Sequence, residues 1–315
     1  MMRRLLFFVF LLLSGILFIH FFTFSRGMEE KGGGDPFQKA FSSQYNIYAL
    51  AHPDELSFAG ETVPLERHDI RESFDRELLV NTYWQSSTLL LLKRANRWFP
   101  VIEPILEEHG IPGDFKYLAL IESNLTQAVS PAGARGFWQI LEGTGRDLGL
   151  EINDYVDERY HVEKSTVAAS EYLLDAKERY GSWTLAAAAY NIGNARLRRI
   201  LDNQQVDCYY DLFLNEETAR YVFRILAIKT IFSNPETAGF HVRLEDLYPV
   251  ETYYTIAVDT AISDLPGFAQ KHHTTYKALR NLNPWMRRYE LPNPTGKTYH
   301  IKLPPTETDT AVVKP

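Results

Sequence analysis

Glu122 is the residue in this sequence with the strongest case for acid–base chemistry. It follows an amphipathic stretch in which Phe115, Leu118 and Ile121 recur at a spacing of three. A helix would place the Glu122 carboxyl beside that apolar stripe, because it follows Leu118 by four residues. A carboxylic acid partly withdrawn from water keeps its proton above the ordinary pKa of about 4.3, as a general acid for glycoside cleavage must. Taken alone, a glutamate near a helix end is more often a solvated charge or a cap.

A turn-rich loop at residues 130–139 (SPAGARGFWQ) carries a second chemical signal. It delivers Trp138 and Gln139 side by side. Sugar-binding sites use this pairing, since an apolar ring packs on the sugar face while an amide serves its hydroxyl or acetamido groups. The alternative interpretation is a purely structural loop.

Two further patches follow at residues 189–193 (AYNIG) and 217–222 (ETARYV). The first places Tyr190 and Asn191 where an apolar helix breaks at a glycine, and the second begins a long helix and carries Tyr221. Each has a structural alternative, a C-terminal cap or an N-terminal capping run. The order and spacing of all the patches together favour a glycan site over these separate structural roles.

Composition excludes several other classes of function. The formal net charge is −7 and no dense Lys/Arg block occurs, which argues against nucleic acid as a partner. The single cysteine, Cys208, can form no internal disulfide, and no Cys/His cluster has metal-ligand spacing. His272 and His273 are adjacent and therefore point in different directions. The sequence predicts no metal and no cofactor.

The elements that must position these residues are predicted to be mainly helical. Apolar periodicity and capping residues predict helices from residue 71 to Trp98, from Pro104 to Gly110, from Asp114 as a cap through Ile121, from Glu163 to Tyr180 with Gly181 as a stop, from Trp183 to Tyr190 with Ser182 as a cap, and from Glu216 to Phe232.

A different pattern begins after about residue 239. Two alternating segments enclose two short helical ones, which predicts a small strand-helix-helix-strand module at residues 253–258, 263–271, 275–282 and 298–303. The expected division of the chain is an anchor or signal at residues 1–27, a tether and irregular segment at 28–70, a helical domain at 71–240, the module at 241–303 and a tail at 304–315.

The N-terminal apolar run predicts a membrane anchor. Arg3 and Arg4 precede an almost uninterrupted apolar stretch from Leu5 to Phe24. As a helix these residues span about 30 Å, the thickness of the hydrocarbon core. The arginines place the rest of the chain on the outer side. A cleaved signal is the alternative, but its apolar core is usually shorter, and no cysteine is available for a lipid anchor.

Taken together, the Glu-Ser, Gly-Phe-Trp-Gln and Ala-Tyr-Asn patches resemble the lytic transglycosylase family related to goose-type lysozyme, and within it the membrane-bound murein transglycosylases of the D type. Residues 111–121, 157–159 and 218–227 add to the similarity, which covers roughly residues 78–232. The resemblance implies a lysozyme-like, mostly helical domain with a glycan groove. Phe137, Ile192 and Asn194 depart from the family pattern without removing a chemical group.

The resemblance implies a role for each patch. Glu122 is the expected catalytic acid/base, and Gln139, Tyr190 and Asn191 are expected to position the sugar. Residues expected beside them in the groove are Ser123, Trp138 and Tyr221. The implied reaction cleaves the β-1,4 bond between N-acetylmuramic acid and N-acetylglucosamine of peptidoglycan. Glu122 protonates the bridging oxygen and then takes the proton of the muramic C6 hydroxyl, which closes a 1,6-anhydro ring.

Peptidoglycan strands, and the membrane through residues 5–24, are thus the expected partners, on the periplasmic side of a bacterial cell envelope. No protein partner is indicated. Two alternative functions stay open. A lysozyme-type hydrolase would use Glu122 with a second carboxylate, for which Glu142, Asp147 and Asp157 are near in sequence. A catalytically silent glycan-binding protein would keep the groove without turnover.

The C-terminal module resembles a peptidoglycan-binding LysM repeat through residues 279–284 (LRNLNP). The usual Gly-Asp-Thr-Leu turn is replaced by Val258-Asp259-Thr260-Ala261. Because every motif patch precedes the module, residues 71–240 are expected to suffice for cleavage. The module is then expected to raise the local glycan concentration.

Overall fold

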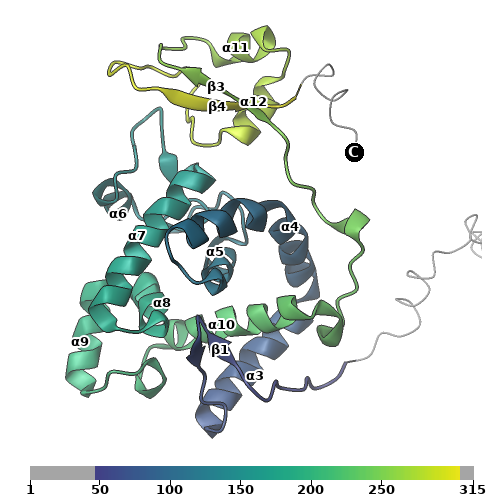
Figure 1. Ribbon diagram of the computed structural model, residues 1–315, viewed down its shortest axis with the longest axis vertical. Coiled ribbons are helices and arrows are strands. Elements are labelled where there is room, and N and C mark those ends of the chain that lie inside the picture. Colours follow the sequence, from purple (N-terminus) through teal and green to yellow (C-terminus); the bar gives the residue numbers. More distant parts are fainter. Residues whose placement is uncertain (1–46, 306–315) are drawn as a thin grey trace, which may run out of the picture. The chain divides into compact units, whose positions relative to one another are not determined.

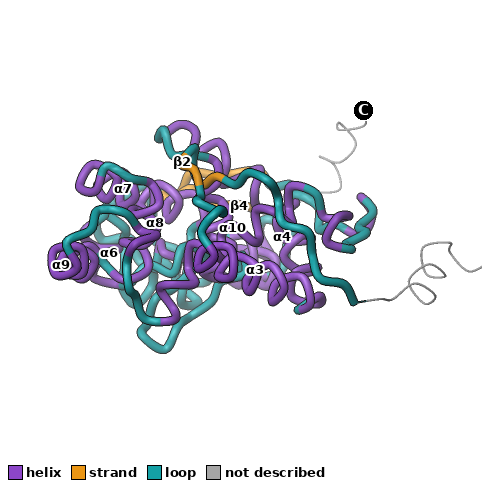
Figure 2. Tube along the Cα trace, turned by 90° about the horizontal axis from the view of Figure 1, so that it is seen from below, coloured by secondary structure: helices purple, strands orange, loops and turns teal. Residues whose placement is uncertain are grey.

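The computed structural model describes residues 47–305, which are mainly helical (Figure 1). Figure 2 shows that strands are confined to two short pairs. The predicted fold class is confirmed. The helices are α3 (His68–Tyr83), α4 (Gln85–Glu108), α5 (Lys116–Ser123), α6 (Glu142–Asp147), α7 (Val162–Tyr180), α8 (Trp183–Ile192), α9 (Asn194–Gln204), α10 (Glu216–Ser233), α11 (Leu265–Lys271) and α12 (Tyr276–Leu282).

Within residues 47–305, no helix has both the length and the apolar character needed to cross a bilayer. The anchor predicted at residues 5–24 lies outside the described residues, as do residues 28–46 of the predicted tether and irregular segment and residues 306–315 of the predicted tail.

The segment before α3 belongs to the helical domain, contrary to the irregular segment expected there. Strands β1 (Ser57–Phe58) and β2 (Glu61–Thr62) pair antiparallel around a two-residue turn, Ala59-Gly60. Both turn residues have positive φ (51° and 81°), as the tight hairpin turn with the twist of the strands requires. The Phe58 side chain is fully buried in the main core. The sequence did not reveal this because two-residue strands give no readable alternation.

The first two helices differ from the prediction in where they break. A single helical stretch was expected through Trp98, yet α3 ends before Trp84 and α4 then continues unbroken to Glu108. Pro100 and Pro104 lie inside α4, so the short helix expected to begin at Pro104 is wrong. Each proline removes one helical hydrogen bond. Tertiary packing compensates, because the apolar residues of α4 between and after them are buried in the core.

α5 is the central helix of the site and is enclosed by longer ones. It packs between α4 and α10 (Figure 1). Asp114, expected to cap it, instead lies in a 3₁₀ turn (Gly113–Phe115). The Asp114 carboxylate accepts hydrogen bonds from the Ala59 backbone at 2.7 Å and from Lys229 Nζ at 2.6 Å. It therefore ties the hairpin turn and α10 to the start of α5.

The remaining helices follow their local signals closely. Gly181 ends α7 in the left-handed conformation, and the Ser182 hydroxyl accepts the Leu185 N–H at the start of α8, both as predicted. Gly193 ends α8 and leads directly into α9, which was not predicted. α10 packs along α3 and buries most of its apolar residues.

The C-terminal module has the predicted strand-helix-helix-strand order. β3 (Tyr254–Val258) pairs antiparallel with β4 (Tyr299–Leu303), with Tyr254 opposite Leu303. α11 and α12 cover this pair and form a second core with it. That core also includes Val156 and Tyr160, which precede α7 in the chain.

Candidate active site

Glu122 lies in the last turn of α5, and its side chain is half-buried. The helix ends directly after it because Asn124 adopts the left-handed conformation, with φ of 54°, and donates its N–H to the Leu120 carbonyl at 2.8 Å. The carboxyl is therefore held at a helix terminus against the apolar body of the domain, as the sequence predicted.

The surroundings of Glu122 favour its protonated form. Burial raises the pKa of Glu122 above its ordinary value, and the nearby charge of Glu217 acts in the same direction. A hydrogen bond from Tyr221 and the positive charge of Arg224 act in the opposite direction and do not cancel the effect of burial. A larger share of this carboxyl is consequently protonated near neutral pH than of a solvated glutamate.

The residues that act on Glu122 come from one face of α10. Glu217, Tyr221 and Arg224 are spaced by four and three residues, so a helix aligns them on one side. The Tyr221 hydroxyl donates a hydrogen bond to Glu122 Oε1. Burial, followed by the negative charge of Glu122, raises the pKa of Tyr221 well above its ordinary value, so the phenol stays protonated as a donor. The sequence named Tyr221 but missed Glu217 and Arg224, which this helical spacing could have revealed.

Tyr190, at the end of α8, approaches Glu122 from another direction. Burial and then the charge of Glu122 raise the pKa of Tyr190 well above its ordinary value, which indicates that the two groups are close. The Tyr190 hydroxyl donates to the Trp138 carbonyl at 2.7 Å, while its ring meets that of Tyr172 edge to face. Tyr190 therefore links α8 to the loop that carries Gln139.

Gln139 belongs to a tightly bonded loop at residues 128–141, here called the Gln139 loop. Gln139 itself has a positive φ of 46°. Its side-chain nitrogen donates to the carbonyls of Gly136 at 2.8 Å and Ala128 at 3.1 Å. Both carbonyls can only accept, so the amide orientation is fixed. The Gln139 Oε1 accepts no hydrogen bond from the described residues and is the group left for a ligand.

The next residue of the AYNIG patch, Asn191, is half-buried, and its side-chain amide has no hydrogen-bond partner among residues 47–305. It offers a donor and an acceptor to a ligand. Asn191 and Gln139 thus keep free polar groups, while the hydroxyls of Tyr190 and Tyr221 are already committed within the domain.

Two residues predicted to line the site do not present their side chains to it. Trp138 is fully buried, and its indole N–H donates to the Thr166 hydroxyl at 2.8 Å. The prediction that its ring packs on a sugar is corrected, because no ring face is open. Ser123 is also buried, and its hydroxyl donates to the Ala119 carbonyl of its own helix at 3.1 Å. Both side chains support the structure around Glu122.

The three carboxylates considered as partners for a hydrolase lie in other settings. Glu142 is exposed and paired with Arg146 at 2.9 Å, and Asp147 is exposed on the same helix. Asp157 is buried in an ion pair with Arg159 at 2.8 Å. None of these charges acts on Glu122.

An open depression of about 370 Å³ lies on the surface of α10, lined by Glu216, Glu217, Arg220 and Arg224. It includes the two charged residues that act on Glu122. No group of three or more His, Cys, Asp or Glu side chains within residues 47–305 is arranged to hold a metal ion.

A helical domain with one half-buried carboxyl at the end of a central helix, held by tyrosines from two other helices, is of the lysozyme-like class. Comparison with known families is more specific. Residues 101–211 match the transglycosylase SLT domain, and residues 254–307 match the soluble lytic transglycosylase C-terminal LysM-like domain. The chain therefore carries an SLT transglycosylase domain followed by a LysM-like C-terminal domain.

Individual curated proteins are also similar to this chain. Membrane-bound lytic murein transglycosylase D of Escherichia coli strain K12 is 29% identical over 239 residues, which cover 71% of this chain and 52% of the relative. A putative tributyltin chloride resistance protein of Alteromonas sp. strain M-1 is 29% identical over 123 residues, 38% of this chain and 59% of the relative. The chain thus spans about half the length of the curated relatives it matches.

Proposed function

We propose that this protein is a peptidoglycan lytic transglycosylase with Glu122 as its single acid/base residue. It cleaves the β-1,4 bond between N-acetylmuramic acid and N-acetylglucosamine and leaves 1,6-anhydromuramic ends. The observation that carries the proposal is a half-buried glutamic acid with a raised pKa and a phenol bonded to its carboxyl. The match to the transglycosylase SLT domain and the similarity to a lytic murein transglycosylase support the substrate class.

In the first step, protonated Glu122 donates its proton to the bridging oxygen as the bond from that oxygen to C1 of the muramic sugar breaks. Positive charge develops at C1. The raised pKa of Glu122 serves this step, since it keeps the proton available near neutral pH. The carboxylate formed is stabilised by the Tyr221 hydroxyl, which already donates to Oε1.

In the second step, the C6 hydroxyl of the same sugar attacks C1 and transfers its proton to the Glu122 carboxylate. This closes the anhydro ring and restores the protonated acid. The nucleophile is tethered to the reacting carbon, so no water has to be recruited or activated. One carboxyl is sufficient for both proton transfers.

The free polar groups around Glu122 are proposed to orient the sugar. Gln139 Oε1 can accept from a hydroxyl or an acetamido N–H, and the Asn191 amide can serve either kind of group. Tyr190, which interacts with Glu122, also holds the Gln139 loop through the Trp138 carbonyl. These are positional roles and leave proton transfer to Glu122.

A lysozyme-type hydrolase is the second candidate, and Glu217 is the observation that favours it. Glu217 is the described carboxylate whose charge acts on Glu122. In a hydrolase it would hold and activate a water, for which carboxyl groups about 6.5–9.5 Å apart are needed in an inverting enzyme. Glu217 is exposed on α10.

Product analysis of digested peptidoglycan sacculi separates the two candidates. Anhydro ends are lighter than reducing ends by one water and take up no hydrogen from borohydride. The proposal requires that most new ends be of the anhydro type. A majority of borohydride-reducible ends would establish the hydrolase, and the absence of any cleavage would leave a glycan-binding protein.

We also propose that the protein acts at the cell envelope, on the periplasmic side, with residues 5–24 as an uncleaved anchor. The length of the apolar run supports this, as does the membrane-bound relative. Amino-terminal sequencing of the mature protein tests it. A terminus just beyond Phe24 would establish a cleaved signal instead.

A further inference from the structure

Residues 151–160, here called the seam segment, lie between the Gln139 loop and the C-terminal module. On the module side, the backbone N–H of Asp157 donates to the Trp285 carbonyl at 2.9 Å. The Arg287 N–H donates to the Tyr155 carbonyl at 2.7 Å. The Val156 side chain, 1% exposed, is part of the module's core. The module therefore holds the seam segment by backbone pairing and by burial.

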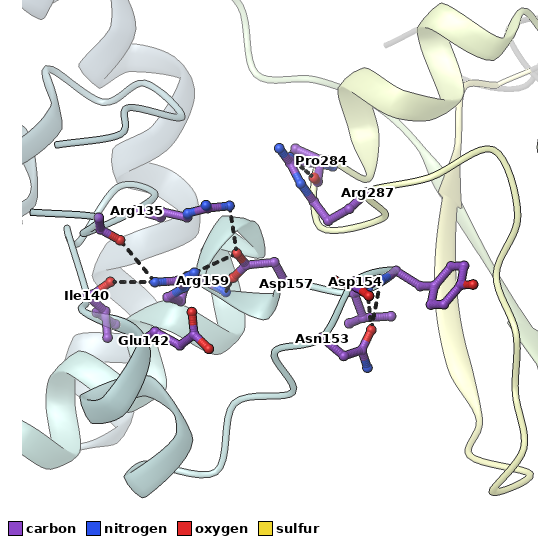
Figure 3. Close-up of polar contacts among 12 residues, drawn as sticks. Arg135, Ile140, Glu142, Asn153, Asp154, Asp157, Arg159, Pro284 and Arg287 are labelled. Atoms are coloured by element: carbon purple, nitrogen blue, oxygen red, sulfur yellow. Dashed lines mark hydrogen bonds and ion pairs between the residues drawn. The ribbon is translucent and has the colours of Figure 1, made fainter. Parts of the chain in front are cut away.

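On the other side, the seam segment holds the Gln139 loop through Arg159. Figure 3 shows Asp157 facing the guanidinium groups of Arg159 and Arg135. Arg159 is 2% exposed and binds Asp157 at 2.8 and 2.9 Å in a two-pronged ion pair. The same guanidinium donates to the Gly133 and Ile140 carbonyls, at 3.2 and 3.4 Å. Both carbonyls belong to the Gln139 loop.

Close packing fixes the same loop at Gly136. A Cβ placed on Gly136 would lie 2.0 Å from the Arg159 carbonyl oxygen, and φ there is +77°. Only glycine permits this approach. The loop and the seam segment are thus in backbone contact three residues before Gln139.

Ion pairs add to the attachment between the module and the seam segment. Lys297 lies 2.6 Å from Glu151 and 3.2 Å from Glu158, and the Tyr299 hydroxyl donates to Glu151 at 2.9 Å. Lys302 of β4 pairs with Glu163 at the start of α7.

The connection from α10 to β3 is also attached to the helical domain. Its Tyr248 N–H donates to the Lys93 carbonyl at 3.2 Å, and the Arg97 guanidinium donates to the Pro249 carbonyl at 3.0 Å. Arg97 further pairs with Glu251 at 3.3 Å. The connection therefore lies along α4 instead of behaving as a free tether.

We propose that the C-terminal module is a positioning element of the active site, and that Arg159 is the positioning residue through which it acts. The module fixes the seam segment, and Arg159 with Asp157 fixes the Gln139 loop. That loop in turn supplies Gln139 and the carbonyl bonded by Tyr190. This proposal differs from the expectation that the module mainly raises the local glycan concentration. The effect on catalysis rests on the proposed function, whereas the effect on loop order does not.

The proposal distinguishes two kinds of loss. If the module only raised local glycan concentration, weakening its attachment would raise KM on sacculi and leave kcat on a short soluble glycan unchanged. A positioning element instead acts on the orientation of groups around Glu122. Weakening it lowers kcat on the short glycan as well, because misplaced groups lose transition-state contacts.

The first test uses the full chain with Lys297→Met and Lys302→Met combined, which removes the ion pairs of Lys297 with the seam segment and of Lys302 with Glu163. Lys271→Met with Lys277→Met is the matched control, because both lysines are exposed on the module and form no ion pair with the residues that the structure describes. Amide hydrogen exchange in residues 128–141 is expected to accelerate about tenfold in the first variant, equivalent to about 1.4 kcal/mol of local stability. In the same variant, kcat on a soluble glycan oligomer is expected to fall by a larger factor than KM changes. In the control variant, hydrogen exchange and kcat are both expected to stay unchanged.

The second test addresses Arg159 itself. Arg159→Lys keeps a positive charge for Asp157, but a single ammonium cannot bond Asp157 and two loop carbonyls at once. It is expected to lower kcat and accelerate exchange in the Gln139 loop, while Arg159→Met, which leaves Asp157 unpaired, has the larger effect on both. If Arg159→Met does not fold, Arg159→Lys and the combined Lys297→Met and Lys302→Met variant (the seam variant) still decide the test.

Unchanged exchange in residues 128–141 together with unchanged kcat in both the seam variant and Arg159→Lys would overturn the proposal. If the wild-type chain cleaves no glycan, the proposed function fails, and hydrogen exchange alone still decides whether the module orders the loop.

Discussion

Two helix ends in this protein each hold a glutamate, and the two carboxyls have opposite properties. Glu122 stands at the C-terminal end of α5 with a raised pKa, while Glu61 of β2 faces the N-terminal end of α8 and has a pKa of about 2. Burial is the largest influence on both, and it raises both. The difference comes from the donors that each carboxylate meets.

Glu61 accepts hydrogen bonds from a complete ring of donors. The Thr184 hydroxyl and N–H donate at 2.7 and 2.9 Å, the Trp183 N–H at 2.6 Å and the Ser182 hydroxyl at 2.8 Å. The two N–H groups are unpaired backbone donors of a helix start, where the helix dipole also favours an anion. Within residues 47–305, Glu122 has one donor, Tyr221, at a helix end that disfavours negative charge. Burial therefore raises the pKa of Glu122, where few hydrogen bonds oppose it, and does not raise that of Glu61, where many do.

The largest effect is expected from a substitution of Glu122, the carboxyl with the raised pKa. Glu122→Gln should lower kcat by about 10²–10⁴-fold, the usual contribution of a general acid, because an amide cannot donate the proton. The fold should persist, since the Gln oxygen can still accept from Tyr221. Activity on sacculi and circular dichroism measure both.

Glu217→Gln is the matched control for that substitution, as it changes the neighbouring carboxylate in the same way. It should retain activity within about tenfold, because the interaction of an exposed charge with its neighbour is worth only about 1 kcal/mol or less. A loss as large as that of Glu122→Gln would support the hydrolase candidate.

The next largest effect is expected from removing the Tyr221 hydroxyl, which donates to Glu122. Tyr221→Phe should lower kcat by about 10- to 100-fold, because a hydrogen bond to a charged group is worth about 1.5–3 kcal/mol. The bond lowers the pKa of Glu122 in the wild type, so its loss raises that pKa. The alkaline limb of the pH profile should move to higher pH. An unmoved limb would show that Tyr221 does not act on the reacting carboxyl.

A substitution of Glu61, which accepts several hydrogen bonds at the start of α8, should change stability and not catalysis. Glu61→Gln should lower the free energy of unfolding at pH 7 by about 1–2 kcal/mol, as loss of a helix cap does. The folded pKa of about 2 lies below the unfolded value, so the contribution of Glu61 is present above about pH 4.3 and is lost as pH falls toward 2. The difference between wild type and variant should therefore narrow between pH 5 and about pH 2.

Urea unfolding at several pH values checks this, with Glu66→Gln as the control on a neighbouring exposed glutamate. A difference that stays constant over that pH range would mean that the Glu61 charge is not what stabilises α8.

The smallest effect is expected at an exposed carboxylate. Glu142 pairs with Arg146 four residues along α6, with both side chains more than half exposed. Glu142→Gln should cost no more than about 0.5 kcal/mol of stability and leave activity unchanged. Unfolding and turnover measurements that instead showed a hundredfold loss of activity would make Glu142 a candidate catalytic partner again.

Local signals were sufficient for much of the framework. The mainly helical fold, the cap at Ser182, the stops at Gly181 and Gly193 and the four-element C-terminal module all follow from residues adjacent in sequence. The position of Glu122 beside an apolar stripe also follows from helical spacing alone. These features depend on backbone conformation over one or two turns, which the sequence encodes directly.

What the sequence could not give is the direction in which side chains from distant elements face one another. Trp138 was expected at a sugar and is in the core, because Thr166, 28 residues away, offers its indole a partner. Two prolines were accommodated within α4 because its packing outweighs the lost hydrogen bonds.

The sequence by itself determined that Glu122 would end a short helix against an apolar wall. Only the tertiary structure decided that one phenol from α10, 99 residues later, would be its donor, and that a seam with the C-terminal module would hold the Gln139 loop. The reason is physical. A pKa and a loop position depend on burial, charge and hydrogen bonds summed over neighbours in space, and these neighbours are set by packing between elements far apart in the chain.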